Sequence, residues 1–405
     1  MLSAAIRETT RLRRLVEASR RDRTPERVFE DLQEGIDAGQ VKLENYSIRG
    51  LFESLIDGGR ELVDSWDPRQ GGGGYSMGEA LHRQALIEEA GAVTSTAFSR
   101  ITGQLVVSAV LEKYMDESFV FTPLVKAVDT QFSGEKIPGI SRIGDEADVV
   151  PEGREYPRVG VSEDYIETPE TRKRGMIDAL TREAVFFDRT GLVVERCGEV
   201  GYFLGVNKEK RIIDAVIDEN VTAHRYKWKG TTYATFQTST PWINSTTNNA
   251  LVDWTDIDAV EQVMANLTDP YTGEPIQIVP KHLIVTRDLL YTARRIVNAT
   301  EITMNAGGYA TSGNLSATKT TANPIQGYQI VSSALLKARL GTDTTWFVGD
   351  IGKAVKYMQN FPLTVVQAPA NSQAEFERDI VMQWKASERG AAAVVEPRAL
   401  GKSAA

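Results

Sequence analysis

The sequence of 405 residues contains one cysteine, Cys197, and no long apolar run. A single cysteine excludes a disulfide within the chain and a metal site built from several thiolates. No segment reaches the roughly 18 apolar residues of a membrane-spanning helix, and the Arg-rich N-terminus lacks the continuous apolar core of a signal peptide. We therefore expect a protein that is made and kept in a cytoplasm and has no membrane partner.

Histidine is also scarce, which limits metal sites. The three histidines are His82, His224 and His282. None of them stands in a spacing typical of zinc sites. Asp253, Asp256 and Asp258 are close in sequence, but they lack the glycine and the terminal glutamate of a calcium loop and suit a helix N-terminus. The sequence predicts no metal and no cofactor.

One stretch has the pattern of a hydrolase: residues 74–78, GYSMG, satisfy the G-x-S-x-G elbow. That elbow follows a buried strand, whereas glycines precede Ser76, and Ser76 with Glu79 makes a capping box instead. Cys197 fits a small buried residue better than a nucleophile. The segment 401–403, GKS, lacks the first glycine and the following helix of a phosphate loop. We predict no enzyme, with a soluble hydrolase using Ser76 as an alternative.

The net charge of −9 argues against a general nucleic-acid binder, because phosphate contacts need clustered Lys and Arg. The first 23 residues differ from the whole, since they carry seven arginines against three acidic residues. A solvated helix face explains this cluster, and contact with an acidic partner or with nucleic acid is the alternative.

The chain divides at a glycine-rich linker. Residues 1–66 have the periodicity of short charged helices, and DPRQGGGG at 67–74 breaks every regular pattern. Residues 133–180 are rich in Gly, Pro and charge but contain β-prone pieces. Because a structureless loop of that length is unusual in a compact domain, we predict a long two-stranded arm.

Residues 181–218 predict the longest helix, with Thr181 as its N-terminal cap. Gly191, Gly198, Gly201 and Gly205 fall inside this segment, and each costs about 1 kcal/mol against Ala in a helix. Another backbone packed closely against the helix would explain these glycines. A break near residues 205–208 is the alternative.

The second half of the chain mixes helices and strands. We predict a capped helix at residues 253–267. We predict that residues 281–300 form a strand that leads into a helix near Thr286, and that residues 300–324 form a flexible loop. Residues 376–400 read as two β-runs around a charged turn.

In the first of these runs, Trp384 and Ala386 share one face, and Gln383 and Lys385 share the other. The turn contains Glu388 and Arg389. A projecting arm and exposed sheet edges are useful when neighbouring copies cover them, in head-to-tail interfaces that close into rings.

Three segments carry a resemblance to a known family. They are EGREYPRVGVSEDYIETPETRKRGMIDALTREAV, HLIVTRDLLYTARRIVNATEI and FERDIVMQWKASERGAAAVVEPRAL. In this order they resemble the major capsid proteins of tailed bacteriophages, the Hong Kong ninety-seven type fold. The resemblance covers roughly residues 93–402 and implies an α+β protein.

The resemblance implies a division of the chain into named parts. These are a charged helical N-terminal segment with a scaffolding role (1–66), a Gly-rich linker (67–78), an N-terminal arm and entry to the peripheral domain (79–132), an extended loop (133–175), the spine helix of the peripheral domain (176–220), an axial domain (221–345), and the peripheral-domain sheet with the C-terminus (346–405).

By this resemblance the chain assembles as pentamers and hexamers into an icosahedral shell around double-stranded DNA, which it contacts without sequence specificity. Its location is the virion, after assembly in the host cytoplasm. Scaffold, portal, protease and decoration proteins are further implied partners. An encapsulin-like compartment shell is the alternative that shares the fold.

Charged residues of the arm and of the terminal segment are candidates for contacts between subunits: Arg154, Glu155, Arg172, Lys173, Arg174, Glu377, Asp379, Glu388 and Arg389. Some relatives cross-link subunits through a Lys and an Asn with an assisting Glu. By resemblance the candidates are Lys136 or Lys173, Asn360 or Asn371, and Glu375 or Glu377.

Overall fold

The structure is a computed structural model that describes part of the chain. The described residues are 106–107, 109–138, 150–155, 165–181, 192–218, 225–228, 231–239, 242–269, 273–305, 318–368 and 380–404. They form an α+β fold, as the resemblance implied. Two compact units divide the chain. Unit 1 comprises Met1–Asp116, Arg174–Val206 and Leu363–Glu388, and unit 2 comprises Glu117–Lys173, Asn207–Pro362 and Arg389–Ala405.

A five-stranded sheet is central to unit 2, in the order β11-β8-β12-β15-β7. β12 (Trp346–Gly349) pairs antiparallel with β8 (His282–Ile284) and with β15 (Leu400–Ala404). β11 (Gln329–Val331) and β7 (Ser245–Thr247) add parallel partners at the two edges. Every residue of β8 and β12 is buried, in keeping with their mostly apolar sequences.

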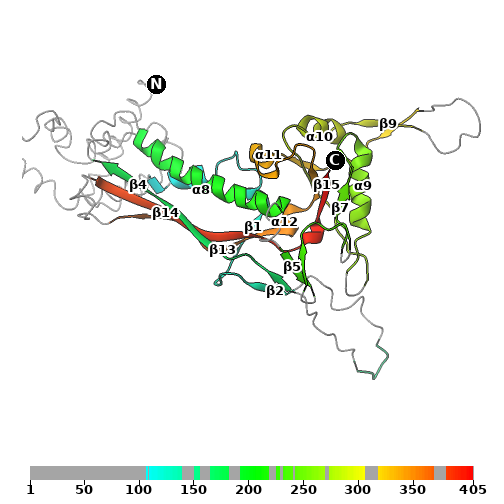
Figure 1. Cartoon of the computed structure of the whole chain (residues 1–405), viewed down its shortest axis with the longest axis horizontal. Helices are drawn as coiled ribbons and strands as arrows, with labels where there is room; N and C mark the ends of the chain where they lie inside the picture. The colour runs from blue at the N-terminus through cyan, green and yellow to red at the C-terminus, as the bar shows by residue number, and fades with distance from the viewer. Residues whose placement is uncertain are drawn as a thin grey trace, which may run out of the picture. The chain divides into compact units, whose positions relative to one another are not determined.

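Two helices cover this sheet. α9 (Trp254–Ala265) lies along β15 and α10 (Leu290–Val297) lies beside β11 (Figure 1). Val260 and Met264 of α9 join a buried core that includes Trp346. The predicted helix at 253–267 and the strand-to-helix reading of 281–300 are confirmed, although α10 begins at Leu290 rather than near Thr286.

A second core in unit 2 lies around the C-terminal half of the long helix α8 (Leu192–Ile217). Ile212 and Ile213 pack there with Phe121 and Phe347. Shorter helices complete the unit: η3 (Thr122–Leu124), α11 (Ala334–Leu340), α12 (Ile351–Ala354) and η4 (Pro397–Ala399).

Glu209 of α8 is buried in this region but fully paired. Its carboxylate accepts hydrogen bonds from the backbone N–H groups of Val120, Phe121 and Thr122 at 2.9, 2.8 and 2.8 Å, and from the Thr122 hydroxyl at 2.5 Å. A buried carboxylate needs such donors to offset its desolvation. The chain that enters unit 2 is thereby fixed to α8.

α8 runs without a break through its glycines, so the alternative of a break at 205–208 is wrong. The close backbone is the helical segment before residue 115 in unit 1. A Cβ built on Gly201 would lie 2.0 Å from the carbonyl oxygen of Val110, which no neighbouring backbone can accommodate. The predicted cap is wrong, however. Thr181 ends strand β4 (Arg172–Thr181), because β-prone residues continue to that point.

β4 belongs to a four-stranded sheet with the strand order β1-β13-β14-β4. β1 (Lys126–Asp129) is parallel to β13 (Val355–Gln367). β13 and β14 (Ile380–Val394) run in opposite directions, since Ala368 N–H donates to the Gln383 carbonyl and the Thr364 hydroxyl donates to the Ser387 carbonyl.

The predicted turn at Glu388 and Arg389 is therefore wrong, because both lie inside the 15-residue strand β14. The hairpin partner of this strand is β13. Small residues permit the continuation: a Cβ on Gly390 would meet the Tyr357 ring at 2.7 Å. The predicted face alternation is correct, since Trp384 and Ala386 are buried and Lys385 is exposed.

The remaining strands include the root of the predicted arm. β2 (Lys136–Pro138) pairs antiparallel with β3 (Tyr165–Glu167), in a sheet of order β2-β3-β5-β6 with β5 (Arg225–Trp228) and β6 (Thr231–Ala234). The two ends of the arm are thus paired strands; residues 139–149 and 156–164 lie outside the described residues.

The predicted flexible loop at 300–324 needs correction. β9 (Glu301–Asn305) and β10 (Thr318–Ala322) pair antiparallel in register, so both ends of the segment are strands (Figure 1). Their threonines suit a pleated sheet although few bulky residues are present.

We predict that Gly201→Ala destabilises the subunit by about 3 kcal/mol, because the added methyl overlaps the Val110 carbonyl. Urea unfolding followed by circular dichroism measures the change. Glu199→Ala, an exposed site on the same helix, is the control and should change stability little. A Gly201→Ala protein as stable as the control contradicts the close packing.

Candidate functional site

The arm carries four candidates for subunit contacts that face solvent. Arg154 and Glu155 are exposed, and so is Arg172 at the start of β4. Lys173 is also exposed and Arg174 is half-buried. Within the described part of the chain, Arg154 and Arg172 form no recorded ion pair. Their side chains are therefore available to a neighbouring molecule.

Two candidates on β14 are instead used within the chain. Glu388 is 2% exposed and its carboxylate accepts a hydrogen bond of 2.5 Å from the Tyr114 hydroxyl. Arg389 Nε donates to the Thr171 hydroxyl at 3.1 Å. Thr171 is itself buried. These positions do not suit the exposed ion pairs that the sequence suggested, because the side chains point to internal partners.

The cross-link candidates are spread over the fold. Lys136 lies 3.8 Å from Glu167 across the β2–β3 pair. Asn360 lies in β13, where its Nδ2 donates to the carbonyls of Thr130 and Phe132. Lys173 is exposed in β4. The other cross-link candidates, Asn371, Glu375 and Glu377, fall outside the described residues, and so does the contact candidate Asp379. Ser76, His82 and His224 lie outside them as well.

The aspartates of 253–258 act as the sequence suggested. Asp253 accepts from Thr255 N–H at 2.8 Å, and Asp256 accepts from Asp253 N–H at 2.9 Å, which completes a capping box at the start of α9. Asp258 accepts from Gln262 one turn later. Within the described segments, no cluster of three or more His, Cys, Asp or Glu side chains could hold a metal.

Cys197 is buried in α8 at 1% exposure. Burial raises the pKa of its thiol, and a hydrogen bond to Asp178 with the charge of that carboxylate raises it further. A thiol held in its neutral form is a poor nucleophile.

As for membranes, the described helices include none whose length and apolar content suffice to cross a bilayer.

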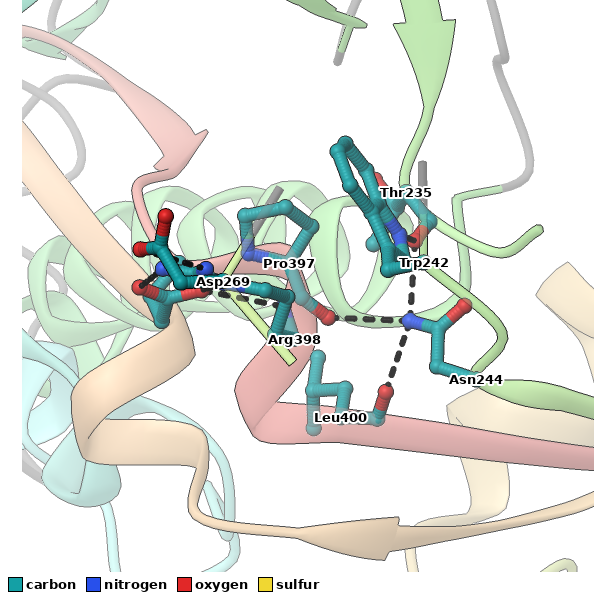
Figure 2. A network of polar contacts seen from close by, with 8 residues as sticks. Thr235, Trp242, Asn244, Asp269, Pro397, Arg398 and Leu400 are labelled. Carbon is teal, nitrogen blue, oxygen red and sulfur yellow. Dashed lines mark hydrogen bonds and ion pairs between the residues drawn. The ribbon is translucent and has the colours of Figure 1, made fainter. Parts of the chain in front are cut away.

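A buried polar network in unit 2 holds the segment before β15, and sequence reasoning did not find it. Figure 2 shows the side-chain amide of Asn244 between the carbonyls of Pro397 and Leu400. Its Nδ2 lies 3.0 and 2.9 Å from these two oxygens and 3.0 Å from the Thr235 carbonyl. Its Oδ1 accepts from Gln237 N–H at 2.8 Å. The amide joins the segment at 235–244 to the segment at 397–400, which is distant in sequence.

Arg398 lies next to this amide and is almost fully buried (Figure 2). Its guanidinium donates to Glu396 at 2.8 and 3.1 Å and lies 3.6 Å from the buried carboxylate of Asp269. Removing one member of such a buried group leaves an uncompensated charge, which is costly.

Another buried polar group surrounds His282 at the start of β8. His282 Nδ1 accepts from Ile351 N–H at 3.4 Å, and Asp350 forms a 2.9 Å ion pair with Lys281. Burial lowers the pKa of His282, against the opposing effects of the Asp350 charge and a backbone contact with Gly349. Burial alone would raise the pKa of Asp350, but the hydrogen bond and charge of Lys281 outweigh it and the net pKa is lowered.

The sequence model of the family described as "Phage capsid protein" matches residues 165–403, which is more than half of the chain. The chain therefore belongs to the phage capsid protein family. Its class is that of a structural major capsid protein of a bacteriophage. No curated protein matches the sequence.

Solved structures similar to this chain include two that are described as capsids and one described as a virus-like particle. The capsid of a native GTA particle is 10% identical, with 72% of this chain and 91% of that chain covered and a TM-score of 0.44. A cyanophage Pam1 capsid subunit is 13% identical, with 71% and 93% covered and a TM-score of 0.44. A virus-like particle from Pyrococcus furiosus is 10% identical, with 73% and 96% covered and a TM-score of 0.41.

We predict that Asn244→Asp lowers the free energy of unfolding by more than about 3 kcal/mol, because a carboxylate oxygen would replace a donor that faces three carbonyls. Chemical denaturation measures it. Asn248→Asp is the matched control, since Asn248 is exposed and its positive φ of 58° is tolerated by both residues. Equal effects of the two substitutions would rule out the network as the cause.

We also predict that acid destabilises unit 2 through His282. Because its folded pKa is below the ordinary value of 6.5, the unfolded chain binds the proton more readily. The stability that His282 contributes is therefore complete above pH 6.5 and declines as pH falls below it. Thermal unfolding from pH 7.5 to pH 5 should show a smaller decline for His282→Asn, which does not titrate, than for the native chain. Parallel declines would argue against this assignment.

Proposed function

We propose that the chain is the shell subunit of a tailed bacteriophage and assembles as pentamers and hexamers into an icosahedral shell around double-stranded DNA. Family membership over residues 165–403 is the observation that carries this proposal. That range includes the returning strand of the arm, α8 and the five-stranded sheet. Assembly takes place in the host cytoplasm, with the virion as the final location.

The proposed parts of the subunit follow from the resemblance. Residues 133–175 are the extended loop, and residues 1–66 serve as a scaffolding segment. The assignment of 221–345 and 346–405 to separate domains needs one change, because β12 and β15 are hydrogen-bonded to β8 and β7 in one sheet. We therefore assign β12 and β15 to the same domain as β7 and β8.

The acidic body of the subunit fits a shell that encloses DNA. The net charge of −9 supports this role, because a strongly basic lining would bind the packaged phosphates tightly. Contact with DNA is then weak and independent of sequence. Scaffold, portal, protease and decoration proteins are further partners in this proposal.

Expression of the chain alone, followed by sedimentation and cryo-electron microscopy, tests the proposal. Closed shells or rings of five and six subunits are the expected products. Co-expression with the scaffold and portal encoded by the same phage is the second arm. A homogeneous monomer or dimer under both conditions would reject the shell role.

Exposed charges on the returning strand of the arm provide a sharper test. We propose that Arg172 and Lys173 meet acidic groups of a neighbouring subunit, since both are exposed. Each exposed pair contributes about 0 to 1 kcal/mol, but every subunit repeats the contact. Arg172→Glu with Lys173→Glu should reduce the yield of shells at least about tenfold at 0.15 M salt, while unassembled subunits stay folded by circular dichroism.

The matched control is Lys126→Glu, which makes the same kind of charge change at an exposed site on β1. It should leave the yield of shells close to that of the native chain. If the doubly substituted chain assembles as well as this control, the arm does not use these two charges.

A further inference from the structure

The root of the arm is held by side chains of the two strands β13 and β14 within unit 2. β1 ends at Asp129 beside Gln359 of β13, and Thr130 N–H then donates to the Gln359 carbonyl at 2.8 Å. The next residue of β13, Asn360, donates through Nδ2 to the carbonyls of Thr130 at 2.9 Å and Phe132 at 3.0 Å. One amide therefore fixes the chain just before the arm begins.

The turn that follows is tied by further hydrogen bonds. Gly134 has a φ of +83°, which reverses the chain and favours glycine. The Thr130 hydroxyl donates to the Glu135 carboxylate at 2.9 Å and accepts from Phe132 N–H at 3.2 Å. The carbonyls that Asn360 binds thus belong to a turn with a defined shape.

The outgoing and returning strands are joined at Thr168, which is buried. Its hydroxyl accepts from Glu135 N–H at 2.7 Å, and its own N–H donates to the Glu135 carbonyl at 2.9 Å. Beyond this point β2 pairs with β3. Motion of the outgoing strand would therefore carry the returning strand with it.

The returning strand has its own attachment three residues later. Thr171 is 5% exposed, and its hydroxyl accepts from Arg389 Nε of β14 at 3.1 Å. Since Asn360 belongs to β13 and Arg389 to β14, the chain that enters the arm and the chain that leaves it are bound to different strands of the hairpin. Two attachment points fix a direction, whereas one would allow rotation.

We propose that Asn360 and Arg389 are positioning residues that set the direction in which the arm leaves the subunit. This inference rests on the proposed function, because an arm matters to assembly when it reaches a neighbouring copy. Loose anchoring would let the arm sample many directions, and few of them would satisfy a closed shell.

The same geometry assigns Asn360 a role other than cross-linking. An attacking amine on its amide carbon would form an amide bond and release Nδ2 as ammonia. That nitrogen donates to two backbone carbonyls, and Oδ1 is buried with no hydrogen-bond partner among the described residues. The described part of the chain therefore supplies no donor that would stabilise negative charge on Oδ1, as acyl transfer requires.

Asn360→Asp is the main test, because it keeps the shape and replaces the donor with an oxygen that repels both carbonyls. Thr171→Val removes the other acceptor at nearly constant volume. Asn298→Asp is the control, because it introduces the same charge change at an exposed residue. Thermal unfolding of the unassembled subunits shows whether each variant folds.

The first measurement is hydrogen–deuterium exchange of residues 130–138 and 165–171 in unassembled subunits. We expect exchange at the root to accelerate at least about tenfold in Asn360→Asp and in Thr171→Val, with exchange in β8 and β12 unchanged. Exchange like that of the native chain and of Asn298→Asp in both variants overturns the anchor. Acceleration spread over β8 and β12 also overturns it, because the effect would then be general destabilisation.

The second measurement is the yield and regularity of shells. The two anchor variants should give at least about tenfold fewer closed shells, with open or irregular particles, while Asn298→Asp behaves as the native chain. Normal shells from variants with loosened roots would overturn the link to assembly. If the native chain itself forms no shells, the proposed function fails, and the exchange experiment still decides the anchor.

A denaturing gel of native shells decides between anchoring and cross-linking. We expect Asn360→Ala to leave the pattern of covalent species unchanged. A ladder of linked subunits that Asn360→Ala abolishes, in particles that still assemble, would overturn the positioning role.

Discussion

Unit 2 depends on the insertion of β15 between β12 and β7. β15 contributes residues 400–404, while its parallel neighbour β7 lies at 245–247, so the central pairing joins segments more than 150 positions apart. Without β15, β12 would become an open edge and β7 would lose its only recorded partner. Asn244 secures this insertion, because it binds the turn at Pro397 from the residue just before β7. Contacts of such long range make folding slow.

The position of the arm's root depends on this sheet. β12 leads through α12 directly into β13, which carries Asn360. Because hydrogen-bonded strands bend little over a few residues, the position of the anchor is determined by the core that holds β12. A surface contact between arms gains little from each exposed charge, so the sum is useful only when the contacts form together. Precision at the root therefore matters more for assembly than the strength of any one pair.

Local patterns in the sequence predicted local structure well. The aspartates at 253–258 correctly predicted a capped helix, and the energetic cost of Gly201 in a helix correctly indicated a backbone packed against it. Errors arose where a distant partner decides the outcome. Glu388 and Arg389 suggested a turn because charges are usually solvated, but Tyr114 and Thr171 satisfy them inside a continuous strand. Asn244 and Asn360 gave no signal, since an amide looks the same in sequence whether it is solvated or bound to two carbonyls.

The subunit uses charge in two separable ways. Buried charges are matched within the chain: Arg398 by Glu396, and Glu209 by backbone N–H groups. Exposed charges such as Arg172 remain available outside it. Salt screens exposed pairs far more than buried ones. Raising the ionic strength should therefore weaken contacts between subunits while the folded subunit persists, and this separation is what a shell requires if it is to correct assembly errors without unfolding its parts.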